Sequence, residues 1–534
     1  MEYVFPSRRS QVMSSRGMVA SSQPLAVQAG VSMLLQGGNA VDAAIATAAA
    51  LNVVEPMSTG LGGDVFALVY LGKTGELVGL NASGRAPYDA SLEKLRNLGY
   101  KEMPFLGIHA VTIPGALDGW CSLLNRYGTM SLAQVLAPAI QLAESGFPVS
   151  EVIGYDWKKN EARLQSDAGM ASTYLVDGKA PKPGEIFVQP DLAYSFKKIA
   201  QGGRDVFYRG EIAEAIVACS EKHGGLITMP DMQDCASAWV TPISTNYRGY
   251  DIYECPPNSQ GLVTLLALNI LESYDLKSLG HNAAAYLHLL IEAVKLALAD
   301  ARGYVADPDF GDIPLAGLLS KTYAVQRRKL INVSKIMPQA EAGVPGVADT
   351  VYVAASDKDG NSVSFINSIF NPFGSGIMVE GTDICLHNRG SSFSLDPSHP
   401  NCLKPHKRPY HTLMPGMVFK NGNLFLTLGV TGGLMQPQGQ VQVLLDIIDF
   451  GMDVQTALDA PRFSYMGQNI VSFEPGISAE VLQELAQKGH IITQVGEPYS
   501  RVFGGGQVIM RHPSTQALIA GSDHRRDGCA IGVW

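Results

Sequence analysis

A predicted hairpin with a hydroxyl residue at its open end constrains this chain more than any other feature. Residues 351–356 are apolar and small, residues 357–360 are a turn signal, and residues 361–368 have the pattern of a returning strand. Paired positions in an antiparallel hairpin sum to a constant, so this turn places Thr350 nearly opposite Ser368. Two hydroxyl groups are therefore predicted to face each other at the start of the hairpin.

Thr350 has two interpretations. The simpler one is an ordinary β-branched strand residue. The other follows from chemistry, because a threonine hydroxyl is a weak nucleophile until a base takes its proton. The base that needs no second residue is the threonine's own α-amine, which exists only after the chain is cut between Asp349 and Thr350. On this hypothesis Thr350 becomes a new N-terminus.

Motifs along nearly the whole chain favour the second interpretation. They are, in chain order, Gly37-Gly38-Asn39-Ala40-Val41-Asp42-Ala43-Ala44, Gly60-Leu61-Gly62-Gly63, Pro114-Gly115, Asp307-Pro308-Asp309-Phe310, Thr350, Asp357-Lys358-Asp359-Gly360-Asn361, Ser368, Phe373-Gly374-Ser375-Gly376, Lys407-Arg408-Pro409 and Thr431-Gly432-Gly433. In this order they resemble the γ-glutamyltransferase family, whose members are self-processing N-terminal-nucleophile hydrolases. The segment that begins at Thr350 resembles the start of the family's small subunit.

Length and composition indicate a packed, loop-rich globule and do not select its reaction. With 534 residues the chain exceeds one ordinary core, which favours two domains or one large domain built from two segments. Its 46% hydrophobic residues, 56 Gly and 30 Pro fit that interpretation. The formal net charge of −9 argues against nucleic acid or an anionic membrane as the main partner.

We expect a cytoplasmic protein. The start of the sequence lacks a charged-then-apolar leader, and the longest apolar stretch, residues 43–54, is shorter than the roughly 20 residues that a membrane span needs. The seven cysteines are scattered without a Cys-X-X-Cys spacing, which predicts reduced, mostly structural thiols and no zinc site. Neither a metal nor a cofactor is expected.

Local signals predict several elements. Residues 24–36 have helical periodicity, and Asn39 is placed to cap a following alanine-rich helix, with Asp42 three residues on. A glycine-rich loop precedes a strand over residues 65–70, the reverse of the order in a phosphate-binding loop, so no nucleotide role is expected. A long helix is predicted over residues 284–304, with charges spaced for ion pairs on a solvated or salt-bridged face. Further helices are predicted over residues 443–451 and 479–487, and strands between residues 491 and 519.

Mixed helices and strands without a strict βαβ rhythm predict an α+β layered fold. The resemblance implies the four-layer αββα sandwich of N-terminal-nucleophile hydrolases. On that interpretation residues 1–349 form the large segment and residues 350–534 the small one, interwoven in one core. The second segment is then the protein's own partner. A dimer of such pairs is left open, and neither nucleic acid nor a membrane is expected as a partner.

The resemblance also implies a mechanism. Thr350 Oγ1 attacks the carbonyl of Asp349, an N-to-O shift leaves an ester, and water cleaves it. The freed α-amine has a reference pKa near about 7.7–8.0, which suits a base at neutral pH. The same oxygen then attacks a substrate amide, and water or an acceptor amine releases the acyl group. Gly432 and Gly433 match the family's oxyanion pair, and Ser368 is implied to hydrogen-bond the nucleophile.

The substrate-binding motifs depart from the family pattern. Asn388 lies in the family's Asn-X-X-X-Asp element, where it is implied to help hold the acyl group. The acid of that element, which pairs with the substrate's α-ammonium in the transferases, aligns with Ser392 here, and Arg389 is added. A pair of serines becomes His411 and Thr412. A carboxylate is lost and a guanidinium gained, which suits a substrate carboxylate without an α-amine.

A second departure concerns the arginine that binds the substrate's α-carboxylate in the transferases. Its element reads Asn81-Ala82-Ser83-Gly84-Arg85-Ala86-Pro87 here, so the arginine has moved two places. In an extended segment such a shift keeps the face and moves the Cα by roughly 6.6 Å. Arg85 is therefore either a displaced substrate contact or a surface arginine.

Three functions remain open from the sequence. The first is a self-processing hydrolase or transferase of γ-glutamyl or similar small acyl amides, as in glutathione hydrolases. The second is an oxamate amidohydrolase or a glutaryl-type cephalosporin acylase without γ-glutamyl specificity. The third is of another class, an unprocessed binding protein that keeps the fold without catalysis.

Overall fold

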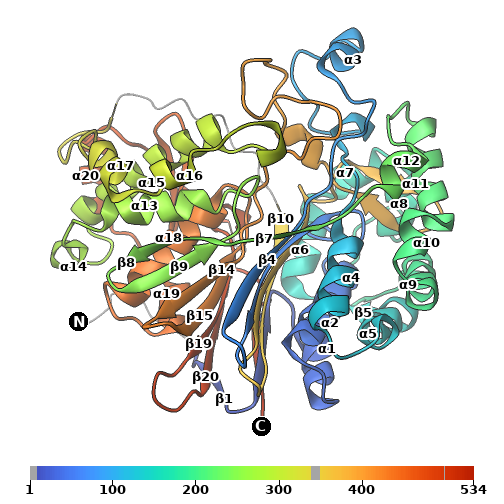
Figure 1. Cartoon of the computed structure of the whole chain (residues 1–534), viewed down its shortest axis with the longest axis horizontal. Coiled ribbons are helices and arrows are strands. Elements are labelled where there is room, and N and C mark those ends of the chain that lie inside the picture. The colour runs from blue at the N-terminus through green and yellow to red at the C-terminus, as the bar shows by residue number, and fades with distance from the viewer. Residues whose placement is uncertain (1–8, 338–348, 498–499) are drawn as a thin grey trace.

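Two seven-stranded antiparallel sheets lie face to face at the centre of the molecule, with helices on both outer faces (Figure 1). The computed structural model describes residues 9–337, 349–497 and 500–534. The first sheet has the order β1 (Val12–Ser14), β20 (Leu518–Ser522), β19 (Gly506–Arg511), β15 (Asn423–Val430), β14 (Gly416–Lys420), β9 (Tyr250–Glu254) and β8 (Ile243–Tyr247). The second has the order β21 (Cys529–Val533), β2 (Gly17–Ser21), β10 (Asp349–Ser356), β11 (Ser362–Phe370), β3 (Asp64–Leu71), β4 (Glu76–Ala82) and β7 (Ala238–Val240). This is the predicted αββα sandwich.

Helices cover the second sheet on its outer side (Figure 1). They are α1 (Pro24–Leu35), α2 (Ala40–Val54), α4 (Ala116–Tyr127), α5 (Leu132–Ser145), α6 (Glu151–Lys159), α7 (Glu161–Gln165), α8 (Ala168–Tyr174), α9 (Pro190–Gly202), α10 (Arg204–Tyr208), α11 (Glu211–Lys222) and α12 (Met229–Gln233). The helices on the other side are α13 (Leu262–Leu271), α14 (Leu276–Leu279), α15 (Ala284–Tyr304), α16 (Leu315–Leu318), α17 (Lys321–Arg328), α18 (Met435–Ile448), α19 (Val454–Asp459) and α20 (Ala479–Gln487).

Short elements complete the chain. They are α3 (Leu92–Asn97), the strand pairs β5 (Phe147–Pro148) with β6 (Ile186–Phe187) and β12 (Ile377–Val379) with β13 (Ile384–Leu386), and the three strands β16 (Phe463–Gly467), β17 (Ile470–Phe473) and β18 (Ile491–Gln494). Four 3₁₀ turns are η1 (Ile108–Ala110), η2 (Pro308–Phe310), η3 (Arg389–Ser392) and η4 (Arg501–Phe503). No helix in the described ranges is both long and apolar enough to cross a membrane.

Three hydrophobic cores separate the four layers. One fills the space between the sheets and includes Phe66, Tyr352 and Met417. The second lies between the second sheet and its helices, and the third between the first sheet and the helices α13, α15 and α18. Both sheets contain strands from before and after Asp349, so residues on the two sides of the predicted cleavage point share every core.

The first two helices follow from local signals, as predicted. Pro24 is the first residue of α1, and Asn39 caps α2 through a reciprocal pair of hydrogen bonds with Asp42. Gly30 of α1 lets the two helices approach closely, because a Cβ there would lie 2.1 Å from the Thr47 hydroxyl of α2. The predicted helix over residues 24–36 and the predicted Asn39 cap of the second helix are both confirmed.

One further element prediction is confirmed and one needs correction. Helix α15 spans the predicted residues and shows the salt-bridged alternative: Glu292 and Lys295 are buried and paired at 2.7 Å. Helix α18 begins at Met435 rather than at residue 443, because the glutamines of its first turns lie in the core and bond to backbone groups of β16. A hydrophobicity pattern misses this part of the helix, because polar residues occupy its core positions.

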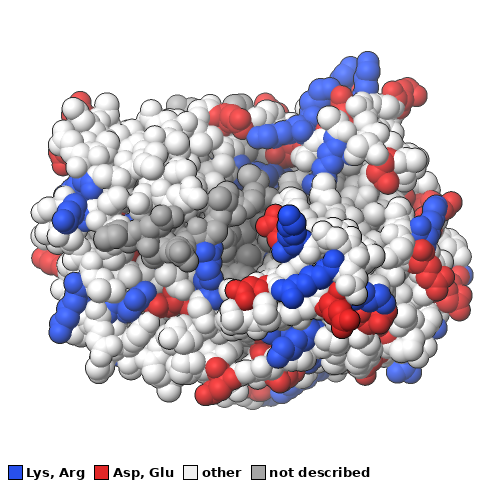
Figure 2. Space-filling view, turned by 90° about the horizontal axis from the view of Figure 1, so that it is seen from above, with Lys and Arg blue, Asp and Glu red and all other residues white. Residues whose placement is uncertain are grey.

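One face of the molecule has a hollow near its centre (Figure 2). Lys and Arg side chains lie on several sides of this hollow, with Asp and Glu side chains among them. Charges of both signs therefore surround the hollow, although the formal net charge of the chain is −9.

Candidate active site

The predicted hydroxyl pair is present at the open end of the hairpin. Thr350 is buried, and its hydroxyl donates to Ser368 Oγ at 3.2 Å. A bulge in the pairing lies between Asp349 and Val351, so the nucleophile candidate sits at an irregular point of the ladder. Ser368 Oγ also accepts a hydrogen bond from the Phe370 amide at 2.8 Å, which fixes the position of the serine oxygen.

The glycine pair lies in the turn between β15 and α18. Gly432 and Gly433 have φ angles of 109° and 59°, in the left-handed region that favours glycine. The carbonyl of Gly433 accepts from Gln260 Nε2 at 2.9 Å. Neither glycine amide donates a hydrogen bond to another group within the described ranges. Two backbone N–H groups are thus available at the start of a helix.

The direction of β15 brings this turn toward the start of β10. Leu428 O accepts from Ser364 Oγ at 3.4 Å, and the next residue, Gly429, lies so close to Tyr352 that a Cβ there would be 2.3 Å from the ring. Ser364 pairs with Ala354, two residues after Tyr352. The neighbour of β15 thus changes from Ser364, opposite Ala354, to Tyr352 as β15 passes from Leu428 to Gly429. The end of β15 therefore points toward the start of β10, where Thr350 lies.

A buried aspartate stands beside the hydroxyl pair. Asp64, the first residue of β3, is the Cα partner of Ser368, so both side chains lie on the same face of the sheet. Its Oδ1 accepts from the amides of Gly84 at 2.9 Å and Gly115 at 3.2 Å. Burial alone would raise its pKa, but contacts with two histidines outweigh burial and hold the pKa well below its usual range.

The two histidines approach the other oxygen of this carboxylate. His411 Nε2 lies 3.0 Å and His387 Nδ1 lies 3.2 Å from Asp64 Oδ2. His411 Nδ1 accepts from the Leu413 amide at 3.2 Å, so the proton of a neutral His411 is on Nε2. Burial, and then the charge of Arg389, lower the pKa of His411 to about 3, against the opposing effect of Asp64.

Arg389 is fully buried beside these groups. Its Nη1 donates to Thr412 Oγ1 at 2.9 Å, and its guanidinium carbon lies 4.0 Å from the centre of the Phe370 ring. Nε and Nη2 have no hydrogen-bond partner, and no carboxylate forms an ion pair with this arginine in the described part of the chain. Burial lowers the pKa of Arg389 to about 9, opposed by Asp64 and then Tyr410. The group therefore remains charged at neutral pH.

The remaining predicted binding residues are engaged in the protein itself. Asn388 Nδ2 donates to Phe105 O at 2.8 Å, and its Oδ1 accepts from the Asn371 amide. Arg85 pairs with Asp307 at 3.3 Å and with Asp309 at 2.8 Å. The substrate roles of Asn388 and Arg85 stay predictions, and for Arg85 these two carboxylates compete with any ligand.

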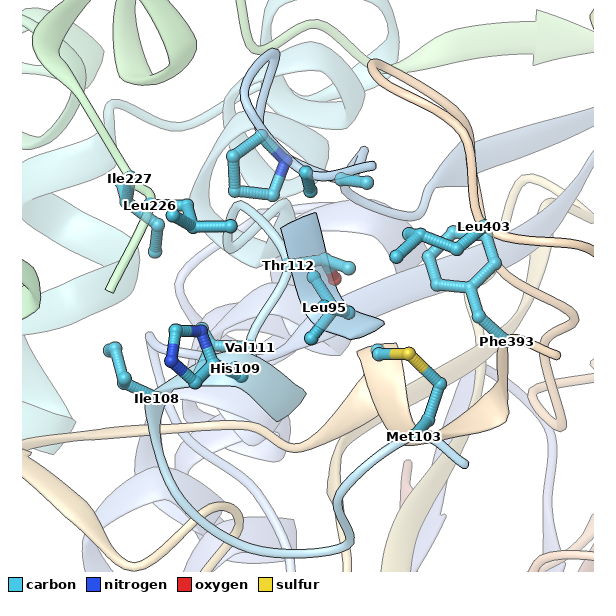
Figure 3. Close-up of a pocket in the computed structure, with 14 residues that line it drawn as sticks. Leu95, Met103, Ile108, His109, Val111, Thr112, Leu226, Ile227, Phe393 and Leu403 are labelled. Atoms are coloured by element: carbon cyan, nitrogen blue, oxygen red, sulfur yellow. The ribbon is translucent and has the colours of Figure 1, made fainter. Parts of the chain in front are cut away.

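An apolar pocket adjoins the turn that carries Arg389. Figure 3 shows Phe393, Leu403 and Met103 facing Ile108 and the 226–227 segment across this space. Gly390 also lines it, and a Cβ there would lie 2.8 Å from Ala110 O. The absence of a side chain lets the η3 turn pack against residues 110–112, close to the apolar side chains.

Asp64, His387 and Phe370 were not predicted as site residues. A charged residue at the start of a buried strand signals a buried polar partner, so the Gly-Gly-Asp sequence carried a usable hint for Asp64. Its partner His411 lies 347 residues further on, and no local pattern joins them. Phe370 has a φ of 76°, which a sequence does not reveal for a phenylalanine.

A four-layer αββα sandwich with a hydroxyl residue at the start of a central strand defines the N-terminal-nucleophile hydrolase class. The sequence profile of the gamma-glutamyltranspeptidase family matches residues 26–533, and the chain belongs to that family. It is an enzyme of the amidohydrolase and transpeptidase type.

Relatives cover the whole chain. A glutathione hydrolase-like proenzyme (YwrD) of Bacillus subtilis is 41% identical over 98% of this chain and 99% of its own. An acylase proenzyme (ACY 1) of a Pseudomonas species is 36% identical over 99% and 96%. The crystal structure of a cephalosporin acylase from Bacillus halodurans superimposes with a TM-score of 0.93, at 44% identity, covering 100% of this chain and 98% of that one.

Proposed function

We propose that the chain cleaves itself between Asp349 and Thr350. Thr350 Oγ1 bonds to the carbonyl carbon of Asp349, the peptide C–N bond breaks, and the hydroxyl proton passes to the departing nitrogen. Water then hydrolyses the ester, which leaves a carboxylate on Asp349 and a free hydroxyl and amine on Thr350. The contact with Ser368 orients the attacking oxygen. Names of relatives as proenzymes support this step.

The processed enzyme then hydrolyses amides through a threonyl ester. The α-amine of Thr350 takes the hydroxyl proton, the oxygen bonds to the substrate carbonyl, and the amine leaves with that proton. The free amides of Gly432 and Gly433 stabilise the oxyanion. Water, or an acceptor amine, releases the acyl group.

The acyl group carries a carboxylate and needs no α-amine. One observation carries this proposal: the Arg389 guanidinium is fully buried with two nitrogen atoms that have no partner in the described residues. A buried unpaired cation is costly, and a substrate carboxylate offers both acceptors that it lacks. Ser392 stands where the transferases carry the partner of an α-ammonium. We therefore place the enzyme with amidohydrolases of short dicarboxylic acids, such as glutaryl or oxalyl amides.

A matched pair of substrates tests this specificity. Glutaryl and pentanoyl p-nitroanilides differ by one carboxylate, and Arg389→Ala should lower kcat/KM for the first about 10- to 100-fold, the loss of a charge-assisted contact, while sparing the second. Arg204→Ala, which breaks the ion pair with Asp118 elsewhere in the molecule, is the control. Equal losses on both substrates would contradict the carboxylate contact.

γ-Glutamyl transfer is the second candidate, because one relative is named glutathione hydrolase-like. It requires a partner for the α-ammonium, and Ser392, the residue that aligns with that partner, carries no charge. A strong preference for γ-glutamyl over glutaryl p-nitroanilide, unaffected by Arg389→Ala, would favour glutathione hydrolysis as the function.

We infer that the two segments stay together as one enzyme after cleavage and act in the cytoplasm. The shared sheets support the first point, because neither segment contains all the strands of either seven-stranded sheet. Seven free thiols, five of them buried, support a reducing compartment. Fractionation of the host cell tests the location, together with a count of the protein's reduced and oxidised thiols in each fraction.

A further inference from the structure

Asp64 is surrounded by donors on both of its oxygens. Two backbone amides, from Gly84 and Gly115, bond to Oδ1, and two imidazole nitrogens, from His387 and His411, approach Oδ2. Three of these groups form hydrogen bonds with Asp64, and His387 Nδ1 lies beside Oδ2 without one. These contacts fix the carboxylate, and no ion pair joins it to Arg389 in the described part of the chain.

The two histidines contact Asp64 in different ways. His387 Nε2 lies 2.8 Å from Thr112 O, whereas its Nδ1 lies 3.2 Å from Asp64 Oδ2 without forming a hydrogen bond. His411 is a neutral donor to Asp64, with its other nitrogen fixed by the Leu413 amide. Its neighbour Thr412 accepts the hydrogen bond from Arg389.

Arg389 and Asp64 influence each other without touching. Asp64 acts to raise the pKa of Arg389, against burial, and Arg389 acts to lower the pKa of His411. A carboxylate at this position stabilises the buried guanidinium from a distance. A carboxylate in direct contact would have filled the nitrogens that a ligand needs.

We propose that Asp64 is a positioning residue for acyl-group specificity: it holds His411, whose neighbour Thr412 fixes the Arg389 guanidinium with Nε and Nη2 left for a substrate carboxylate. The inference rests on the proposed function of Arg389 and extends it to a residue that touches no substrate. The negative charge of Asp64 supports this arrangement, because it favours the charged form of the buried guanidinium and so acts to raise the pKa of Arg389.

Asp64→Asn removes the charge with little change in size and keeps an acceptor for the two amides. The ratio of the glutaryl KM to the pentanoyl KM should rise about 10-fold, the lower end for a charge-assisted contact, whatever the change in kcat that both substrates share. Asp449→Asn, a buried carboxylate that pairs with Arg248 at 2.6 Å elsewhere in the molecule, is the matched control. Intact mass of each variant shows whether self-cleavage is complete before kinetics are compared.

The outcomes separate the two claims. If the wild type does not prefer the glutaryl substrate, the proposed function fails and this inference with it. If the wild type prefers it and Asp64→Asn leaves that KM ratio unchanged, the inference alone fails. Should Asp64→Asn not fold, His411→Gln, which keeps a donor toward Asp64, should have a lower glutaryl KM than His411→Leu. Equal KM values for these two variants would overturn the role of the Asp64 contact.

Discussion

At the residue scale, the glycine pair combines two requirements. Gly433 needs a positive φ, and its amide must face an open space where an oxyanion forms.

The hairpin arithmetic predicted the contact of Thr350 with Ser368, because both residues lie in one local element. It could not predict Asp64 with His411, since that contact depends on how the two sheets stack.

Replacing Gly433 by Val should lower kcat about 10²- to 10³-fold, the effect of one lost oxyanion donor, with a smaller change in KM. The β-branched side chain strains a φ of 59° and moves the amide. Steady-state kinetics on one p-nitroanilide measure the split.

The control for strain alone is Gly451→Val. Gly451 also has a positive φ, 69°, and no atom lies within 4 Å of the position that a Cβ would take. It should lower stability without lowering kcat. A change at Gly433 that is confined to KM would contradict its assignment to the oxyanion site.

At the element scale, α2 supports the hairpin that carries the nucleophile candidate. The Ala40 amide donates to Asp357 Oδ2 at 2.9 Å, and Asp357 Oδ1 accepts from the Asp359 and Asn361 amides, so the helix start and the hairpin turn are one unit. Caps and turns of this kind are predictable because their signals lie within a few residues. The start of α18 was not, since its buried glutamines depend on β16.

Asn39→Ala should lower the free energy of unfolding by about 0.5–2 kcal/mol through loss of the α2 cap. The hydrogen bond from Asn39 Nδ2 to Tyr127 O at 2.7 Å is lost with it. Urea unfolding in a Thr350→Ala background, which is expected to remain one chain, keeps the measurement unimolecular. An unchanged midpoint would show that the cap adds nothing to stability.

At the scale of the whole molecule, buried charged groups tie separate segments of the C-terminal region together. Asp523 is fully buried, pairs with Arg462 at 2.9 Å and with Arg525 at 3.1 Å, and accepts from the Gly506 amide. Burial alone would raise its pKa, but the two arginines outweigh burial and hold the pKa well below its usual range. The mixed pattern predicted an α+β fold, and the resemblance implied the αββα sandwich. The Asp523 pairs could not be predicted, because they form only once the sheets are assembled.

A depressed carboxylate pKa makes stability depend on pH with a definite sign. Asp523 contributes fully above the unfolded pKa of about 3.9, and the contribution is lost as the pH falls below it toward the folded value. Between pH 6 and pH 3 the wild type should therefore lose more free energy of unfolding than Asp523→Asn in the same single-chain background. Parallel pH curves for the two proteins would contradict this account of the Asp523 pairs.

Intact mass spectrometry tests the central claim most directly. The purified wild type should give two polypeptides, one ending at Asp349 and one beginning at Thr350, whose masses sum to that of the whole chain plus one water. Thr350→Ala should give one uncut, folded and inactive chain, because neither the attacking hydroxyl nor the new amine with its adjacent hydroxyl can form. An uncut and active wild type, or a normally cleaved Thr350→Ala, would contradict Thr350 as the nucleophile.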